Sequence, residues 1–244
     1  MANPKAARIE RSEPINPETK LLTLAMPAGE PLGFTGGQYV IVNTNIPLPG
    51  GKIAKRAYSI LSSDADQAKF QIAVKKVGTG PGSNYMHETS PGAELPFSGP
   101  WGQFLSDDAT ASPALVLATD TGITAALGLL QGGKLSSGKE KIRLVWMSES
   151  SDYFLPQGFI KERIPASARF DLAAVPSVNH AQRLEKALDA FKQTLYDGMP
   201  ASVFLSGDGA LLYPFRDELM ARGLAEKQIK IECFFNNPFK KIAA

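Results

Sequence analysis

The first hundred residues are dominated by short stretches in which apolar positions recur at every second residue. The clearest lies at 69–77, where Phe70, Ile72 and Val74 share one face of an extended chain. This period of two is typical of a half-buried strand. Turns rich in Gly and Pro separate further stretches of this kind, at 7–11, 20–26, 38–42 and 56–61. Many short strands at this spacing predict an antiparallel barrel or sandwich.

The pattern changes after residues 106–113, whose sequence Ser-Asp-Asp-Ala-Thr-Ala-Ser-Pro is typical of a linker. Residues 114–119 form a continuous apolar run, which predicts a parallel strand buried on both faces. The clearest helix is predicted over 181–195, where apolar residues recur at four, three and four residues: Leu184, Leu188, Phe191 and Leu195.

Strands and helices alternate through the rest of this half. Further helices are predicted at 123–131 and 210–222, with Pro214 in the first turn of the second, and further strands at 142–147, 169–175, 202–206 and 229–235. This alternation predicts a doubly wound parallel sheet with right-handed crossovers. We therefore expect two domains, an antiparallel β-barrel over 1–107 and an α/β domain over 113–244.

Composition narrows the classes of function. The 244 residues carry a net charge of +2, which is too small to indicate nucleic acid binding. Cys233 is the single cysteine, so the chain forms no internal disulfide and holds no cysteine-ligated cluster. His87 and His180 lie far apart, and no metal site is expected. No Gly-x-Ser-x-Gly motif, membrane span or secretion signal is found, so we expect a soluble cytoplasmic protein.

Candidate binding chemistry begins at Arg56-Ala57-Tyr58-Ser59. On a strand, Arg56 and Tyr58 share one face, and Ser59 turns to the other. A guanidinium can bind phosphate through two hydrogen bonds, and an aromatic ring can lie against a planar ligand. The alternative is a solvated edge strand, on which the same residue types are common.

A glycine-rich segment, Gly78-Thr79-Gly80-Pro81-Gly82, precedes a short helix that we expect to begin near Ser83, with Ser83 as its cap. Glycines let a backbone approach phosphate closely, and a helix N-terminus presents free N–H groups. The segment does not match the Gly-x-Gly-x-x-Gly dinucleotide fingerprint. A flexible hairpin loop is the alternative.

Two further turns follow predicted parallel strands, at Thr119-Asp120-Thr121-Gly122 and Ser206-Gly207-Asp208-Gly209. Ligands of open α/β sheets bind at the carboxyl ends of strands, so both turns are candidates for a dinucleotide site. Asp120 conflicts with this interpretation because a carboxylate repels phosphate. It would instead hold a ribose hydroxyl, point away, or cap the following helix.

The last predicted strand ends in Glu232-Cys233-Phe234-Phe235 at the same edge of the sheet. An aromatic there can shield a planar redox ring, and Glu232 can relay a proton. Simple core packing is an equal alternative for Phe234 and Phe235. Cys233 is interpreted as a small buried hydrophobe rather than a reactive thiol.

The order of these motifs resembles the ferredoxin–NADP reductase family over nearly the whole chain. The motifs are, in order, Arg56-Ala57-Tyr58-Ser59, Gly80-Pro81-Gly82-Ser83, Gly99-Pro100-Trp101-Gly102, Thr121-Gly122, Ser206-Gly207-Asp208-Gly209 and Glu232-Cys233-Phe234. The first is similar to the family's Arg-x-Tyr-Ser flavin motif. The last resembles the reductase module of flavohaemoglobins. No iron–sulfur domain is indicated.

The resemblance implies a flavoenzyme that binds FAD and uses NADH or NADPH. It implies that Tyr58 packs against the isoalloxazine or bonds the ribityl chain, that Ser59 approaches flavin N5, and that Glu232 borders the meeting point of the two rings. These three are the implied catalytic residues. The implied cofactor-binding residues are Arg56, Tyr58, Ser59, Gly80, Gly82, Ser83, Thr121, Gly122, Gly207, Asp208 and Phe234.

The implied reaction is hydride transfer from nicotinamide C4 to flavin N5, followed by electron transfer to a ferredoxin, flavodoxin or oxygenase component. Lys52, Lys55, Lys75 and Lys76 would steer an acidic partner, unless they are simply solvated. One alternative is an NAD(P)H oxidase, or a quinone or free-flavin reductase. Another is a flavin-binding electron-transfer subunit or sensor with impaired nicotinamide binding.

The sequence departs from the family pattern at the nicotinamide end. Asp120 stands where the family has the first glycine of Gly-Thr-Gly, and Ala125 replaces a nearby proline. Ser206 replaces the usual cysteine. Glu149 and Asp152 follow the second parallel strand in place of an arginine, which favours NADH because acidic side chains repel a 2′-phosphate.

Overall fold

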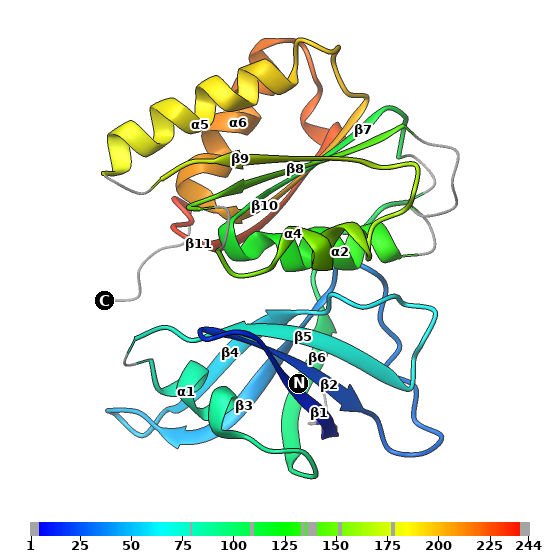
Figure 1. The fold of residues 1–244 in the computed structure, drawn as a ribbon, viewed down its shortest axis with the longest axis vertical. Coiled ribbons are helices and arrows are strands. Elements are labelled where there is room, and N and C mark those ends of the chain that lie inside the picture. The colour runs from blue at the N-terminus through cyan, green and yellow to red at the C-terminus, as the bar shows by residue number, and fades with distance from the viewer. Residues whose placement is uncertain are drawn as a thin grey trace.

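The computed structural model describes residues 5–78, 80–107, 110–132, 135, 141–150, 153–176 and 179–239. Two sheets organise these residues (Figure 1). The first is antiparallel and comes from the N-terminal half of the chain. The second is parallel and comes from the C-terminal half. This architecture confirms the predicted fold class, a β-barrel domain followed by a doubly wound α/β domain.

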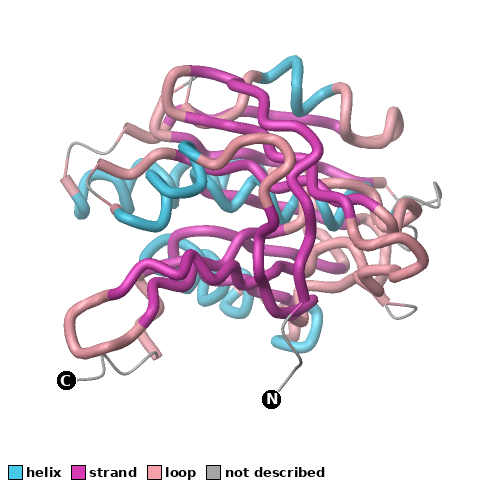
Figure 2. Tube along the Cα trace, turned by 90° about the horizontal axis from the view of Figure 1, so that it is seen from below, coloured by secondary structure: helices cyan, strands magenta, loops and turns pink. Residues whose placement is uncertain are grey.

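The antiparallel sheet has six strands in the order β4-β3-β6-β1-β2-β5. Their bounds are β1 Lys5–Asn16, β2 Thr19–Ala25, β3 Tyr39–Pro47, β4 Ile53–Ser59, β5 Lys69–Lys75 and β6 Glu94–Trp101. The strands curve strongly across the view in Figure 2. At the open side the chain after β4 reaches β5, where the Leu61 amide donates to the Gln71 carbonyl over 2.9 Å. The sheet therefore closes on itself in the manner of a barrel, around a core that includes Phe70, Phe97 and Ile60.

β1 and β3 run beyond the predicted 7–11 and 38–42, and β4 and β6 differ more. β4 was expected over 56–61, but it begins at Ile53 and ends at Ser59. Its pairing ends there because the Ile60 amide bonds the Gln38 carbonyl while Leu61 turns to β5. β6 was not predicted, since Pro96, Gly99 and Pro100 interrupt its hydrophobic pattern.

The helix of the barrel domain, α1, spans Pro81–Glu88. The prediction that Ser83 caps it was wrong, because the helix begins two residues earlier, with Pro81 in the first turn. The Ser83 hydroxyl instead accepts a hydrogen bond from the Val77 amide at 3.1 Å and donates to the Gly80 carbonyl at 3.1 Å. It thereby fixes the hairpin that leads from β5 into the helix.

The parallel sheet has five strands in the order β11-β10-β7-β8-β9. Their bounds are β7 Ala114–Thr119, β8 Ile142–Ser148, β9 Arg169–Ala174, β10 Ser202–Asp208 and β11 Ile229–Phe235. All neighbouring pairs are parallel. The chain leaves β7 toward β8 on one side and later returns to β10 on the other. The switch point between β7 and β10 is where a sheet of this kind binds ligands, at the carboxyl ends of the strands.

Helices cover both faces of the parallel sheet (Figure 1). α2 and α4 lie on the face toward the barrel, and α5 and α6 lie on the outer face. Pro214 was expected in the first turn of α6, but the helix begins at Gly209, so Pro214 is its sixth residue. The bounds are η1 Asp120–Gly122, α2 Ile123–Gln131, α4 Gln157–Lys161, α5 His180–Thr194, α6 Gly209–Ala221 and η2 Glu226–Gln228.

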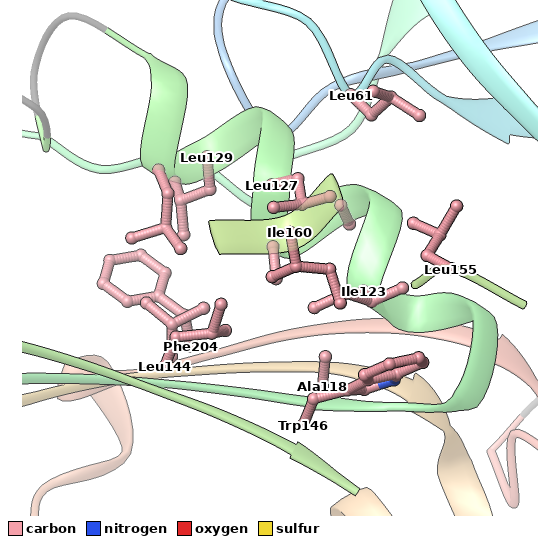
Figure 3. Close-up of a cluster of buried hydrophobic side chains, with 14 of the residues drawn as sticks. Leu61, Ala118, Ile123, Leu127, Leu129, Leu144, Trp146, Leu155, Ile160 and Phe204 are labelled. Carbon is pink, nitrogen blue, oxygen red and sulfur yellow. The ribbon is translucent and has the colours of Figure 1, made fainter. Parts of the chain in front are cut away.

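One hydrophobic cluster joins the two domains. It runs from Leu61 of the barrel domain through α2 and α4 to Trp146 and Phe204 on the inner face of the parallel sheet (Figure 3). α2 also meets the barrel backbone directly, because a Cβ atom added at Gly128 would overlap the Ile60 carbonyl oxygen. Gln131 at the end of α2 donates from Nε2 to the Leu61 carbonyl. The barrel therefore packs against α2 at van der Waals distance.

Candidate functional site

A pocket of about 210 Å³ lies where the two domains meet. Ser59 and its cross-strand partner Tyr39 contribute one wall from β4 and β3. Glu232 and Phe234 contribute the other wall from β11. The remaining lining residues are Ala57 and Cys233. The structure thus brings together three of the predicted site residues, Ser59, Glu232 and Phe234, from segments more than 170 residues apart in sequence.

Glu232 supplies the carboxyl group of this pocket. Burial raises the pKa of its carboxyl group from 4.5 to about 7. Its Oε2 would lie 3.5 Å from a Cβ atom at Gly102, so the carboxyl group lies beside the segment that follows β6. Burial, reinforced by the Glu232 charge, also raises the pKa of Tyr39. A carboxyl group with a pKa near neutrality can hold or release a proton in the physiological range.

Arg56 and Gly82 lie together at the start of α1. A Cβ atom added at Gly82 would stand 2.7 Å from Arg56 Cγ, so the arginine side chain crosses the helix terminus at this glycine. Arg56 is exposed, and its Nη1 donates to the Lys55 carbonyl at 2.8 Å. Helix geometry leaves the amides of Gly82 and Ser83 without intrahelical acceptors. Guanidinium and first-turn amides therefore converge on one spot, an arrangement suited to an anion.

The other residues predicted around this cradle have mixed positions. Gly80 is the N-cap of α1, and its amide bonds the Val77 carbonyl at 2.7 Å. Ser83 is buried, and its hydroxyl is used within the hairpin. Tyr58 is half-buried against the barrel core, and burial, opposed by the charge of Arg56, raises the pKa of its phenol to about 12. Tyr58 therefore remains a neutral hydrogen-bonding ring at neutral pH.

The two turns predicted for a dinucleotide lie side by side at the switch point. The Ser206 hydroxyl donates to the Gly122 carbonyl at 3.0 Å. The Asp208 amide donates to Thr119 Oγ1 at 2.8 Å. Thr121 and Gly122 are thereby held next to Gly207 and Asp208. The β10–β11 pairing sets Gly207 beside Cys233, which connects this region to the pocket.

Asp120 does not face the turn that it begins. Its side chain is buried and forms an ion pair with Arg183 of α5. The same guanidinium lies 3.3 Å from Asp208 Oδ2. Of the possibilities left open by the sequence, the structure favours a carboxylate that is turned into the domain, where a cation pairs with it. Glu149 is exposed, and Asp152 lies outside the described residues.

Comparison with known proteins agrees with this geometry. Residues 6–105 match the oxidoreductase FAD-binding domain family. The chain is 39% identical over 130 residues to ferredoxin–NADP reductase B of Sorangium cellulosum, covering 53% of this chain and 52% of that protein. It is 25% identical over 229 residues to reductase component 2 of terephthalate 1,2-dioxygenase from Comamonas, covering 91% of this chain and 66% of that protein.

The family match covers the barrel half of the chain, and both curated relatives are reductases by name. A ferredoxin NADP+ reductase from Neisseria gonorrhoeae, solved with FAD and NADP bound, has the same fold, with a TM-score of 0.76 at 18% identity. That likeness covers 96% of this chain and all of that one. The chain spans about half to two thirds of the length of the two curated relatives. Among the described residues, no helix combines the length and the apolar character needed to cross a membrane.

Sequence reasoning missed two residues of the candidate site. Tyr39 lines the pocket opposite Glu232, and its place in Gly37-Gln38-Tyr39 at the start of a strand was the available signal. Arg183 was missed because nothing in the sequence of α5 marks it, and its partner Asp120 lies 63 residues earlier.

The raised pKa of Glu232 predicts a pH-dependent stability. Between pH 4.5 and about 7 the folded chain keeps a proton that the unfolded chain has released, so this group's contribution to stability falls as the pH rises through that window. Glu232→Gln removes the effect. We expect the variant to exceed the wild type by about 1–3 kcal/mol in free energy of unfolding at pH 8, and to match it near pH 4.5.

Urea denaturation of both proteins at pH 4.5, 6 and 8 measures this difference. Glu226→Gln, at an exposed position in η2, is the matched control and should show no such trend. A wild-type advantage that grows with pH would contradict the assigned environment of Glu232.

Proposed function

We propose that this protein is an FAD-dependent NAD(P)H reductase that delivers electrons to a separate protein acceptor. In this proposal residues 1–107 form the FAD-binding domain and residues 113–244 the nicotinamide-binding domain. The observation that carries it is the pocket between the domains, in which Ser59 of the barrel faces Glu232 and Phe234 of the last parallel strand. A site for two meeting cofactor rings requires walls from both domains.

The residues of the barrel domain fit FAD. Arg56 and the free amides of Gly82 and Ser83 would hold the pyrophosphate, because a guanidinium and a helix N-terminus both favour phosphate oxygens. Gly80 and the Ser83 hydroxyl shape the loop that presents these amides. Tyr58, neutral and half-buried, would pack along the flavin, and Ser59 would approach its ring nitrogen N5.

The residues of the α/β domain fit a nicotinamide dinucleotide. Thr121 and Gly122 lie in η1, directly before α2, at the switch point. Two hydrogen bonds between the turns hold Gly207 and Asp208 next to them. Phe234, which is 37% exposed, would cover the meeting rings.

The chemistry that bound FAD supplies is hydride acceptance from nicotinamide C4 at N5, followed by release of electrons to the acceptor. The chain's own residues position the rings and handle the proton. Glu232, with a pKa near 7, would hold a proton at the edge of the pocket. Tyr39, Phe234 and Ala57 line the same pocket.

The acceptor is proposed to be a ferredoxin, a flavodoxin or an oxygenase component, since the relative from Comamonas is the reductase component of a dioxygenase. Lys52 and Lys55 are exposed on and beside β4, next to Arg56. Lys75 is engaged otherwise, with its Nζ lying 3.5 Å from the centre of the Tyr153 ring. Lys76, after β5, is exposed, so the steering charge for an acidic partner would come from Lys52, Lys55 and Lys76.

The other interpretations keep the flavin and differ in the donor or the acceptor of its electrons. Direct reduction of oxygen, quinone or free flavin needs no protein acceptor. A sensor or electron-transfer subunit without nicotinamide binding was motivated by the charge of Asp120. Because that charge is paired with Arg183, it no longer supports impaired binding.

Absorption spectroscopy of the purified protein tests the proposal. We expect a yellow protein that releases FAD on denaturation, and whose flavin bleaches rapidly when NADH or NADPH is added without oxygen. The steady-state rate of NADH or NADPH oxidation should rise strongly when ferredoxin, flavodoxin or an oxygenase component is added. A colourless protein that does not take up added FAD would rule the proposal out. If the flavin bleaches but no protein acceptor raises the steady-state rate, the oxidase alternative would be favoured.

A further inference from the structure

Three segments at the carboxyl edge of the parallel sheet meet at one buried arginine. Arg183 in the first turns of α5 is only 8% exposed. One of its terminal nitrogens, Nη2, pairs with Asp120 Oδ2 at the end of β7. The other, Nη1, lies 3.3 Å from Asp208 Oδ2 at the end of β10. Both carboxylates are themselves nine-tenths buried or more.

Each carboxylate belongs to a turn assigned above to the dinucleotide. Asp208 caps α6 by accepting from the Ala210 amide at 3.0 Å, and it also accepts from Asn236 Nδ2 at 2.9 Å. Asp120 has a backbone φ of +49°, in the left-handed region. Its carbonyl accepts from the indole of Trp146 at 2.9 Å. The Asp208 carboxylate therefore has three partners, whereas that of Asp120 depends on Arg183.

The cluster is difficult to explain as a source of stability alone. Two carboxylates face one guanidinium, and Asp120 Oδ1 and Arg183 Nε have no hydrogen-bond partner among the described residues. Buried ion pairs of this kind are commonly no more stable than apolar side chains of the same volume. Their role is then sought in fixing one arrangement of the segments that they join.

We propose that Arg183 is a positioning residue of the nicotinamide site. Its guanidinium holds the Asp120 carboxylate inside the domain and away from the dinucleotide pyrophosphate. The inference rests on the proposed function. The pairing with Arg183 explains how an aspartate is compatible with a nearby phosphate, which its charge would otherwise repel. Asp120 and Arg183 are then a coupled pair, since the acid is compatible with an anionic ligand only while the arginine is present.

The charged and titratable groups around Asp120 define the expected pH dependence. Besides Arg183 and Asp208, Glu149 after β8 acts on it electrostatically, and the pKa of Tyr153 before α4 is raised by burial and, in turn, by the Asp120 charge. Burial raises the pKa of Asp120, while the hydrogen bond and charge of Arg183 lower it. Removal of the arginine therefore favours the protonated, uncharged acid as the pH falls.

Three variants of the FAD-loaded protein test the proposal. Arg183→Met removes the cation and keeps the aliphatic volume. Asp120→Gly/Arg183→Met also removes the acid. Arg169→Met is the control, because Arg169 forms ion pairs with Asp171 and Asp197 but is 61% exposed. The dissociation constants of NADH and NADPH are obtained from the concentration dependence of anaerobic flavin reduction at pH 6 and pH 8. Fluorescence of the buried Trp146 reports the Asp120 turn, with Trp101→Phe as background.

We expect Arg183→Met to weaken nicotinamide binding by roughly tenfold or more at pH 8 and by less at pH 6. The double variant should return to within about threefold of the wild type, since Asp120 is gone and the Asp208 carboxylate keeps its hydrogen bonds from Ala210 and Asn236. FAD content should be unchanged in all three variants. If Arg183→Met fails to fold, recovery of folding and binding in the double variant supports the same coupling.

Two results would overturn the assignment. One is nicotinamide binding in Arg183→Met equal to that of the Arg169→Met control. The other is an equal loss in the single and the double variants, which would make Arg183 a purely structural residue. Failure of the proposed function would be seen separately, because the wild-type flavin would then be reduced by neither nicotinamide.

Discussion

Gly128→Val is expected to lower the free energy of unfolding by about 3 kcal/mol, and to slow flavin reduction in the protein that remains folded. The reason lies in the contact between α2 and the barrel. A Cβ atom at residue 128 would overlap the carbonyl oxygen of Ile60, a backbone atom that cannot rotate away. The barrel must then move from the helix, and with it the wall of the pocket that carries Ser59. Urea denaturation and anaerobic stopped-flow reduction measure the two effects.

Gly158→Ala in α4 is the matched control for this prediction. An alanine Cβ at that position meets nothing within 4 Å, and alanine favours a helix over glycine by up to about 1 kcal/mol. The control should therefore be neutral or slightly stabilising. If Gly128→Val retained wild-type stability and reduction rate, the close contact between the domains would be wrong.

Arg56→Glu is expected to weaken FAD binding by roughly 100-fold, so that the protein is purified largely without its flavin. The change replaces the cation that crosses the N-terminus of α1 with an anion next to the proposed pyrophosphate. Because Arg56 is exposed, the fold itself should lose little stability. Quenching of flavin fluorescence during titration of the FAD-free protein gives the dissociation constant.

Lys55→Glu makes the same charge reversal one residue earlier. Successive side chains on a strand point to opposite faces, so Lys55 lies away from Gly82. We expect it to change FAD affinity by less than about fivefold, through long-range charge alone. Equal losses in both variants would indicate a general electrostatic effect instead of a phosphate contact at Arg56.

The sequence was sufficient wherever local pattern and tertiary environment agree. The limits predicted for the strand at 114–119 and the helix at 123–131 match β7 and α2. β7 is buried throughout because both of its faces are covered. α2 ends at Gln131, with Gly132 as its C-cap. The doubly wound topology follows from such elements, since right-handed crossovers leave few ways to connect them.

The sequence was insufficient wherever distant segments decide. β6 contains Pro96 and Pro100, which local rules assign to loops, yet pairing with β1 and β3 makes it a strand. Asp120 was interpreted from its neighbours as an obstruction, while its partner Arg183 lies on another helix. Charge pairing across 63 residues leaves no periodic signal, so only the folded chain reveals it.

The pocket has a consequence for recombination between this chain and other proteins of the same fold. Ser59 and Tyr39 come from one sheet, and Glu232 and Phe234 come from the other. A chimera that exchanges whole domains would keep the phosphate cradle of Arg56 and Gly82 intact, but it would pair each wall of the pocket with an unfamiliar partner. We expect such a chimera to retain FAD if its barrel does. We expect its turnover to depend instead on whether α2 at Gly128 still packs closely against the barrel backbone at Ile60.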